Sequence, residues 1–321
     1  MILVRSWGLP GNLRLAKPIL LIVCISVLLL SVQPALCWSN NGYSDNPAQP
    51  KYGTHDWIAQ HALDWLPNEE KQYITDNLAT YLYGTELPDN SQAADGIGDT
   101  SKHHIYFYAD GSLPDDAAAQ RASEEYQKAL NYLKNNDYSD AAKTVGTMSH
   151  YIADVAVFGH VMGSKTAWGT ETHHDDYESH VDDNTEAYDS SFNSYLHFDG
   201  SLTTTSTYDA AKNVAYDTTF GGSSGLTCVW MDNNYNWNNP TFSGRCGQSL
   251  NLAVNAVADV LHTLYQQTAS SPIPTQTNSP SPTLSPSPTV PEFPAIQILT
   301  VTMVTVMVMT IVYRKSSPKR S

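Results

Sequence analysis

Nine of the eleven histidines of this 321-residue chain lie between residues 55 and 180, and two of them stand four residues before a carboxylate. His150 precedes Asp154, and His174 precedes Glu178. Residues four apart lie on one face of an α-helix, so each pair presents a nitrogen and an oxygen donor to the same side. Zinc binds both donor types. The spacing therefore predicts a helical scaffold whose helices direct metal ligands into one cleft.

Each pair taken alone also has an ordinary explanation. A His and an Asp four residues apart often form a surface pair on a helix. The run 173–176, His-His-Asp-Asp, also fits an acidic helix start or carboxylates that bind calcium. The joint occurrence of the two pairs, with His160 six residues after Asp154, favours a shared metal site.

The other local patterns between residues 38 and 268 are helical as well. Apolar residues recur at helical spacing, and capping residues, Gly or Pro mark the ends of segments. The predicted helices cover residues 54–66, 68–83, 115–135, 139–158, 171–184 and 248–267. The Thr-rich run 202–207 is the one plausible strand, and the polar stretch 185–246 is expected to form loops and short helices. These patterns predict a single all-α, multi-helix domain over residues 38–268.

The N-terminal residues 1–37 have the layout of a secretory signal. Basic residues are followed by the apolar run 19–30 and by Ala-Leu-Cys at 35–37, with cleavage before Trp38. An uncleaved membrane anchor is the alternative, although the apolar run is short for a span. Cleavage would make Trp38 the mature N-terminus.

The C-terminal segments predict a surface anchor. Residues 269–294 are a Ser/Thr/Pro-rich stalk that ends in a Pro-Glu-Phe-Pro motif, which resembles the PEF-type sorting signals of prokaryotic surface proteins. Residues 295–313 are long and apolar enough for a transmembrane segment, and the basic tail 314–321 favours a cytoplasmic end. We therefore expect an extracellular domain held at the cell surface by its own membrane segment. The sequence indicates no particular oligomeric state.

Charge and cysteine content agree with an exported domain that does not bind nucleic acid specifically. The chain has 32 acidic against 17 basic residues, and seven of the basic residues lie in the two terminal segments. A strongly acidic domain repels polyanions. Cys228 and Cys246 are the only cysteines outside the signal segment, so one disulfide between them is expected, with two buried free thiols as the alternative.

In chain order, these residues resemble the zinc-dependent phospholipase C family, which includes bacterial phospholipase C and clostridial alpha-toxin and is related to the S1/P1 nucleases. The shared features are an N-terminal Trp after signal cleavage, a Gly-Thr-His helix start, a Pro-Asp after a Gly turn, a His before an aromatic stretch ending in Asp-Gly, a His-x3-Asp-x5-His motif and a His-x3-Glu pair. The matching positions are Trp38, His55, Asp89, His104, His150, Asp154, His160, His174 and Glu178. The resemblance implies an all-α domain of the phospholipase C/P1 nuclease type.

The resemblance also implies three Zn²⁺ ions. The implied ligand sets are Asp89, His104, His150 and Asp154 for one ion; His160, His174, Glu178 and water for a second; and Trp38, through its amine and carbonyl, with His55 and a bridging Asp154 for a third. It further implies that Asp89 acts as general base toward the attacking water.

The implied activity is hydrolysis of a phospholipid by metal-activated water, which releases diradylglycerol and a phosphorylated head group. Two departures from the family pattern bear on the substrate. Phe158 stands where a Pro is usual, and Asn90 stands where choline-selective members have an aromatic residue, so strict choline preference is not expected. The alternatives are an S1/P1-type single-strand nuclease and a non-enzymatic zinc-binding surface protein; Glu178, rather than Asp, at the last position favours the phospholipase.

Overall fold

A computed structural model describes residues 43–44, 46–163 and 166–269. This part of the chain forms helices and no strand, apart from two isolated β-bridges, so the predicted all-α fold is confirmed. The α-helices are α2 (Thr54–Ala62), α3 (Asn68–Thr75), α4 (Leu78–Glu86), α5 (Ala117–Lys134), α6 (Tyr138–Asp154), α7 (His174–Asp183), α8 (Thr207–Phe220), α9 (Cys228–Asn233) and α10 (Pro240–Ala269). The 3₁₀ turns are η1 (Leu63–Trp65), η2 (Thr100–Lys102), η3 (Phe158–Val161), η4 (Ser191–Tyr195) and η5 (Gly222–Ser224).

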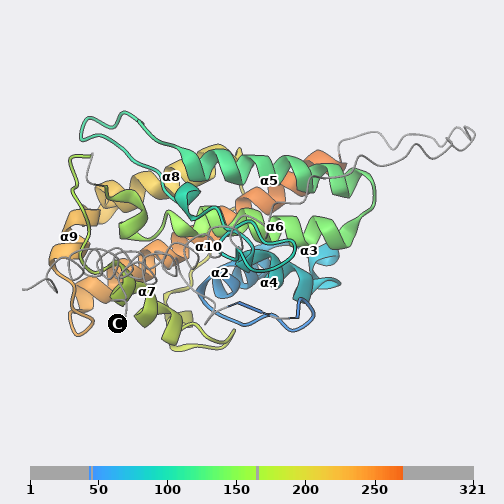
Figure 1. The fold of residues 1–321 in the computed structure, drawn as a ribbon, viewed down its shortest axis with the longest axis horizontal. Coiled ribbons are helices and arrows are strands. Elements are labelled where there is room, and N and C mark those ends of the chain that lie inside the picture. The colour runs from blue at the N-terminus through green and yellow to red at the C-terminus, as the bar shows by residue number, and fades with distance from the viewer. Residues whose placement is uncertain (1–42, 45, 164–165, 270–321) are drawn as a thin grey trace, which may run out of the picture. The chain divides into compact units, whose positions relative to one another are not determined.

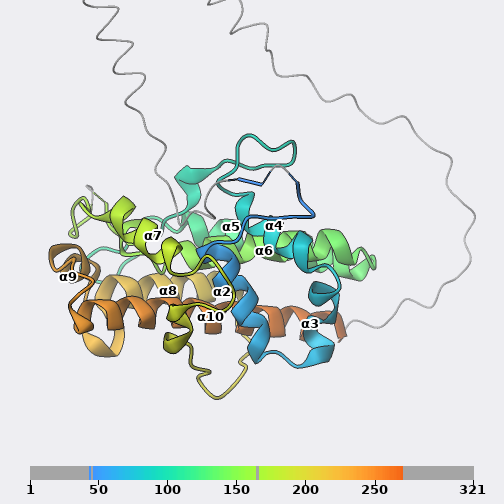
Figure 2. The same ribbon diagram turned by 90° about the horizontal axis from the view of Figure 1, so that it is seen from below.

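The long helices pack around α6. A tight turn joins α5 to α6, and the two helices lie side by side, while α4 packs on another side of α6 (Figure 1). The long α10 contacts α2, α6 and α8 (Figure 2). Large side chains fill the space between these helices and are fully buried, among them Trp57, Tyr81, Met148 and Ile152. This core holds the C-terminal ends of α4 and α6 in fixed positions.

Two glycines let α4 and α6 approach closely. A Cβ atom on Gly84 would lie 2.0 Å from the carbonyl oxygen of Lys143, and one on Gly146 would lie 2.0 Å from that of Tyr81. The Thr147 hydroxyl donates a hydrogen bond to the Gly84 carbonyl across the contact. Gly84 therefore lies inside α4 and serves helix packing. The predicted end of this helix at residue 83, directly before Gly84, is wrong.

Several predicted boundaries differ from the structure for local reasons. The predicted helix 68–83 is split into α3 and α4, because the Asn77 side chain donates to the Tyr73 carbonyl and ends α3. The predicted helix 139–158 ends at Asp154, and Phe158–Val161 form the separate turn η3, which carries His160. Within the polar stretch 185–246, the 14-residue helix α8 was not expected.

The predicted strand 202–207 does not form. Its backbone instead bonds to side chains of α10: the Thr203 amide donates to Asp259, and the Thr205 amide donates to the Thr263 hydroxyl. Because a neighbouring helix supplies these acceptors, the segment needs no partner strand.

The predicted disulfide is wrong, and the alternative of two buried free thiols is confirmed. Cys228 begins α9 and Cys246 lies in α10, and both are free and buried. The Cys246 thiol hydrogen-bonds to Tyr177. Burial raises the pKa of both thiols to about 12, which keeps them protonated and unreactive.

The predicted signal 1–37, Trp38, the stalk beyond residue 269, the membrane segment 295–313 and the tail 314–321 lie outside the described residues. Within the described ranges, no helix has both the length and the apolar character of a membrane span.

Candidate metal centre

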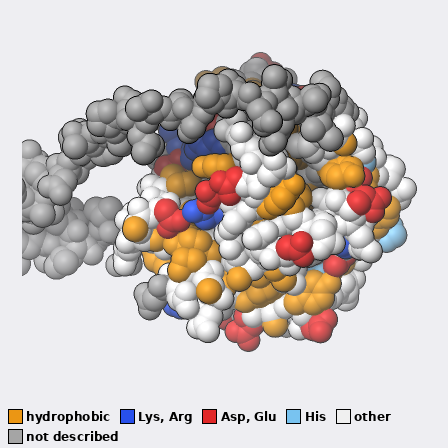
Figure 3. All heavy atoms as spheres, turned by 90° about the vertical axis from the view of Figure 1, so that its right-hand side faces the viewer, with side chains coloured by type: hydrophobic (Ala, Val, Ile, Leu, Met, Phe, Trp, Pro, Cys, Tyr) orange, Lys and Arg blue, Asp and Glu red, His pale blue; other side chains and the backbone are white. Residues whose placement is uncertain are grey.

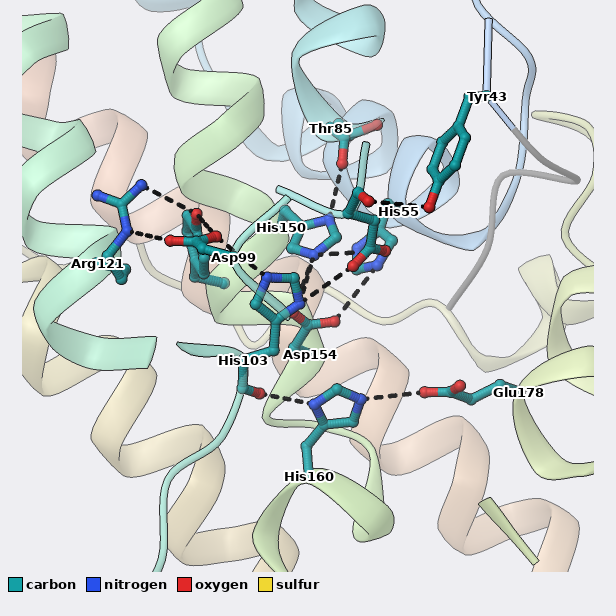
Figure 4. A network of polar contacts seen from close by, with 12 residues as sticks. Tyr43, His55, Thr85, Asp99, His103, Arg121, His150, Asp154, His160 and Glu178 are labelled. Carbon is teal, nitrogen blue, oxygen red and sulfur yellow. Dashed lines mark hydrogen bonds and ion pairs between the residues drawn. The ribbon is translucent and has the colours of Figure 1, made fainter. Parts of the chain in front are cut away.

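Three groups of imidazoles and carboxylates converge where α2, the ends of α4 and α6, η3 and α7 meet (Figure 4). In each group the potential ligand atoms all lie within 4.8 Å of one another. Cluster 1 contains Asp89, His103 and His150; cluster 2 contains His160, His174 and Glu178; cluster 3 contains His55, His150 and Asp154. Of the nine positions predicted from the sequence, seven lie in these clusters.

Asp154 joins clusters 1 and 3. Its Oδ2 atom lies 3.0 Å from His150 Nε2 and 3.0 Å from His103 Nδ1, and its Oδ1 atom lies 3.4 Å from His55 Nε2. The side chain is fully buried. The four-residue spacing on α6 places Asp154 beside His150, and the chain brings His55 and His103 to it from other segments.

Cluster 2 is built around Glu178. Its Oε1 atom lies 3.2 Å from His160 Nε2 and 2.9 Å from His174 Nε2. Its Oε2 atom is buried and has no hydrogen-bond partner among the described residues. The predicted His-x3-Glu pair on α7 therefore meets the histidine of η3.

Backbone carbonyls fix the protonation of two of these rings. His150 Nδ1 lies 2.7 Å from the Thr85 carbonyl oxygen, and His160 Nδ1 lies 2.7 Å from that of His103. A carbonyl only accepts, so each Nδ1 carries a proton, and Nε2 is the nitrogen with a lone pair in the neutral ring. Both Nε2 atoms face carboxylate oxygens, which only accept when ionised. Such contacts are favourable only with a proton or a cation between the two atoms, and this donor set fits zinc.

Residues 54–219 match the family model described as zinc dependent phospholipase C. This stretch covers just over half of the chain and contains all three clusters. The protein belongs to the zinc dependent phospholipase C family. The resemblance seen in the sequence is confirmed, and membership supports Zn²⁺ as the metal of these clusters.

Two solved structures are similar to this family member at low identity. Alpha toxin from Clostridium absonum matches with a TM-score of 0.47 and 16% identity over 68% of this chain and 64% of that chain. Clostridium perfringens alpha-toxin from avian strain SWCP matches with a TM-score of 0.46 and 15% identity over 74% of this chain and 68% of that chain. This chain therefore spans 64% of the length of the first toxin. Neither likeness carries an argument about function. No curated protein matches the sequence.

The structure corrects one predicted ligand of this family member: His103, and not His104, lies in cluster 1. The His104 ring points to Asp115, 3.1 Å away, and stacks on Tyr106. Residue 103 is a bend directly after η2, with φ −91° and ψ 15°, and the two neighbouring rings have different partners: Asp154 for His103 and Asp115 for His104. The aromatic stretch that follows both histidines could not distinguish them.

Electrostatics leave two of the ligand groups, His55 and Asp154, in the states that a metal needs. Burial, reinforced by the proximity of His150, lowers the pKa of His55, so its ring is neutral. Burial alone would raise the pKa of Asp154, but the nearby imidazoles of His150 and His103 hold it well below its usual value. Asp154 is therefore an ionised, buried carboxylate.

Two carboxylates behind the clusters were not identified from the sequence. Asp99 Oδ1 lies 3.5 Å from His103 Nε2, and Glu171 Oε1 lies 3.4 Å from His174 Nδ1. They stand four and three residues before their histidines, spacings similar to those that marked the ligand pairs. The spacing that could have identified them lies on the N-terminal side of each histidine, opposite to that of the ligand pairs.

Proposed function

We propose that this protein is a zinc-dependent phosphodiester hydrolase that cleaves a phospholipid to diradylglycerol and a phosphorylated head group. One observation carries the proposal. Nε2 lone pairs of His150 and His160, fixed by backbone carbonyls, face the carboxylates of Asp154 and Glu178 at 3.0 and 3.2 Å. A metal cation between each nitrogen and its carboxylate satisfies this arrangement, and the protein belongs to a zinc dependent family.

We propose three zinc sites. The ligands would be Asp89, His103, His150 and Asp154 at the first; His160, His174 and Glu178 at the second; and His55, Asp154 and the amine and carbonyl of a mature N-terminal Trp38 at the third. Bound zinc would offset negative charge on the phosphodiester and lower the pKa of a water nucleophile. The first described residues support a nearby N-terminus, because the Tyr43 hydroxyl donates to the Asp89 carbonyl and the Ser44 amide donates to Glu86.

Asp89 is proposed as the general base. Its side chain is 12% exposed, whereas those of His103, His150 and Asp154 are at most 1% exposed. Its Oδ2 atom lies 3.8 Å from His150 Nε2, whereas the Oδ2 atom of Asp154 lies 3.0 Å from the same nitrogen. Asp89 is thus the more exposed carboxylate of clusters 1 and 3, and we propose that it accepts the proton of the attacking water.

The structure around Asn90 supports a substrate specificity that is not restricted to lipids with a choline head group. Asn90 is buried, and its Oδ1 atom accepts hydrogen bonds from the amides of Gln92 and Ala93. The side chain therefore shapes its own turn and supplies no aromatic face for a quaternary ammonium group.

The direct test is hydrolysis by the purified protein with its native N-terminus. The substrates are vesicles of phosphatidylcholine, phosphatidylethanolamine or phosphatidylglycerol, a chromogenic phosphodiester, and single-stranded DNA, each with and without a chelator. We expect diradylglycerol release that chelation abolishes and added zinc restores. Cleavage of DNA alone would point to the nuclease function, and hydrolysis of no substrate would favour a non-enzymatic zinc-binding surface protein.

We also propose that the protein is exported, loses residues 1–37 and stays anchored at the cell surface through residues 295–313. The apolar run 19–30 and the basic tail 314–321 support this topology. Mass spectrometry of the surface protein should find Trp38 as the first residue. One extra residue before Trp38 should remove about one zinc ion per protein, since the α-amine would move away; full zinc content and activity would refute the N-terminal site.

A further inference from the structure

His103 is oriented differently from the other histidines of the clusters. His150 and His160 turn Nε2 to the cluster and give Nδ1 to a backbone carbonyl, whereas His103 turns Nδ1 to Asp154, at 3.0 Å, and to Asp89, at 3.3 Å. Its Nε2 atom therefore points away from the cluster, toward Asp99, whose Oδ1 atom lies 3.5 Å away as an ion-pair contact (Figure 4). Because Nδ1 is a ligand only without its proton, the proton of a neutral His103 ring must stay on Nε2.

Asp99 precedes η2 and is held by two donors, one on α5 and one on α6. Its Oδ2 atom accepts from Arg121 Nε of α5 at 2.7 Å, and its Oδ1 atom accepts from the Tyr151 hydroxyl of α6 at 2.7 Å. Arg121 also donates to the Tyr151 hydroxyl at 3.1 Å and lies over the Tyr151 ring. The carboxylate is thus fixed with Oδ1 directed at the ring of His103 (Figure 4).

The position of His103 matters to two clusters at once. Its ring lies in cluster 1, and its backbone carbonyl accepts from His160 Nδ1 of cluster 2. A contact that holds residue 103 in place therefore supports both metal groups.

We propose that Asp99 is a positioning residue that keeps the Nε2 proton on His103 and so aims the Nδ1 lone pair at the metal of cluster 1. The proposal rests on the proposed function, because it requires zinc in cluster 1. Carboxylates behind metal-binding histidines orient the ring and increase its basicity, and their loss typically costs 10- to 100-fold in metal affinity.

The test is the zinc affinity of the full chain carrying Asp99→Asn, measured by competition with a chromophoric chelator. The amide of Asn can donate to Nε2 and so favour the tautomer with a proton on Nδ1, which blocks the ligand atom. We expect zinc affinity at cluster 1 to fall about 10- to 100-fold, with cluster 2 losing less. Asp99→Glu, which keeps a carboxylate, should lose less affinity than Asp99→Asn.

Glu124→Gln is the matched control. Glu124 is the exposed one of the three carboxylates that pair with Arg121, and the change removes the same charge from the same arginine without touching His103. Its zinc affinity should equal that of the wild type. Unchanged affinity in Asp99→Asn, or equal losses in Asp99→Asn and Glu124→Gln, would overturn the positioning role.

Nitrogen-15 NMR of the His103 ring gives a second readout that needs no variant. In the zinc-loaded wild type we expect a protonated Nε2 and an unprotonated Nδ1; the opposite tautomer would overturn the proposal even if Asp99→Asn failed to fold. A wild type that binds zinc but hydrolyses no phosphodiester would contradict the proposed function alone. Full activity with unchanged zinc affinity in Asp99→Asn would contradict the positioning role alone.

Discussion

The rings of His103 and His104 show how much the environment of a single side chain decides. The His103 ring is 1% exposed and is surrounded by Asp89, Asp99 and Asp154, whereas the His104 ring is 20% exposed and pairs with Asp115 near the surface. The same imidazole is a potential metal ligand in one place and half of a surface pair in the other.

The adjacent pair gives a matched test of the metal site. His103→Ala should remove zinc from cluster 1 and lower hydrolysis about 100-fold or more, since a catalytic metal contributes several kcal/mol to transition-state stabilisation. His104→Ala should keep zinc and activity and change stability by no more than about 1 kcal/mol. Zinc content by atomic absorption and hydrolysis rates check both. Loss of zinc in His104→Ala with retention in His103→Ala would reverse the assignment.

Asp89→Asn separates proton transfer from metal binding. The amide keeps the shape of the side chain and an oxygen ligand but accepts no proton, so the turnover rate should fall about 10²- to 10⁴-fold. Zinc content should stay close to that of the wild type, because buried residues supply the other ligands of cluster 1. Activity and metal content measured on one preparation test this; a turnover rate equal to that of the wild type would exclude Asp89 as the base.

Zinc binding should release protons from His103 and His174. Burial lowers the pKa of each ring, but the carboxylates of Asp154 and Glu178 outweigh it and raise both pKa values to about 10 in the metal-free protein. These values exceed the ordinary 6.5, so the two protons stabilise the metal-free fold below about pH 6.5, and this stabilisation is lost as pH rises through about 10.

Since zinc needs the lone pairs, about two protons should leave on binding near pH 7, and zinc affinity should fall as pH falls. Titration calorimetry in two buffers with different ionisation enthalpies counts the protons. The same heat in both buffers would mean that no proton is released and would contradict the protonated state of the two rings.

At the scale of secondary-structure elements, the contact between α4 and α6 positions the ligands of cluster 1. Gly84 and Gly146 bring the helices together so that the Thr85 carbonyl, near the end of α4, accepts from His150 on α6. Small residues at this crossing thus serve the metal centre as well as the core.

Gly146→Ala should therefore reduce both stability and zinc affinity. Its Cβ would lie 2.0 Å from the Tyr81 carbonyl oxygen, so the helices must separate, at a cost of about 1–3 kcal/mol or more. Gly244→Ala in α10 is the control, because its Cβ meets no atom within 4 Å and the helix gains about 0.5–1 kcal/mol. Denaturant unfolding of both variants with zinc chelated measures the difference. Equal stability of the two variants would show that the α4–α6 contact tolerates a methyl group.

At the scale of the whole molecule, a strongly acidic chain concentrates imidazoles and carboxylates inside one helical domain. The net charge is −15, and acidic side chains are spread among polar and apolar ones on the face in Figure 3. Ligands of the clusters come from segments as far apart as His55 and Glu178, and bound metal would tie α2 to α6 at cluster 3 and η3 to α7 at cluster 2.

Removal of zinc should accordingly lower the unfolding temperature of the whole domain. A ligand that binds only the folded state stabilises it by about 2.7 kcal/mol at a free concentration 100 times its Kd. Calorimetric melting before chelation, after chelation and after return of zinc tests this. An unfolding temperature that stays constant while metal analysis shows zinc to be gone would mean that the clusters do not couple to folding.

Much of the fold could be predicted because helical periodicity and helix ends are local properties of a sequence. The helices that carry His150 with Asp154 and His174 with Glu178 follow directly from their spacing. Helix α8 was not predicted because its buried side consists of small residues such as Ala210, Ala211 and Val214 among Thr and Asp, which give only a weak apolar pattern. In the folded protein, packing against α5 and α10 stabilises this helix.

The sequence by itself determined the all-α class, the family and most members of the three clusters, because these depend on residue types at fixed short spacings. Only the tertiary structure decided that His103 and not His104 enters cluster 1, that Asp99 stands behind it, and that Cys228 and Cys246 stay apart. These outcomes depend on which way a side chain faces. That direction is fixed by contacts such as that of His150 with Thr85, 65 residues apart, which no local pattern records.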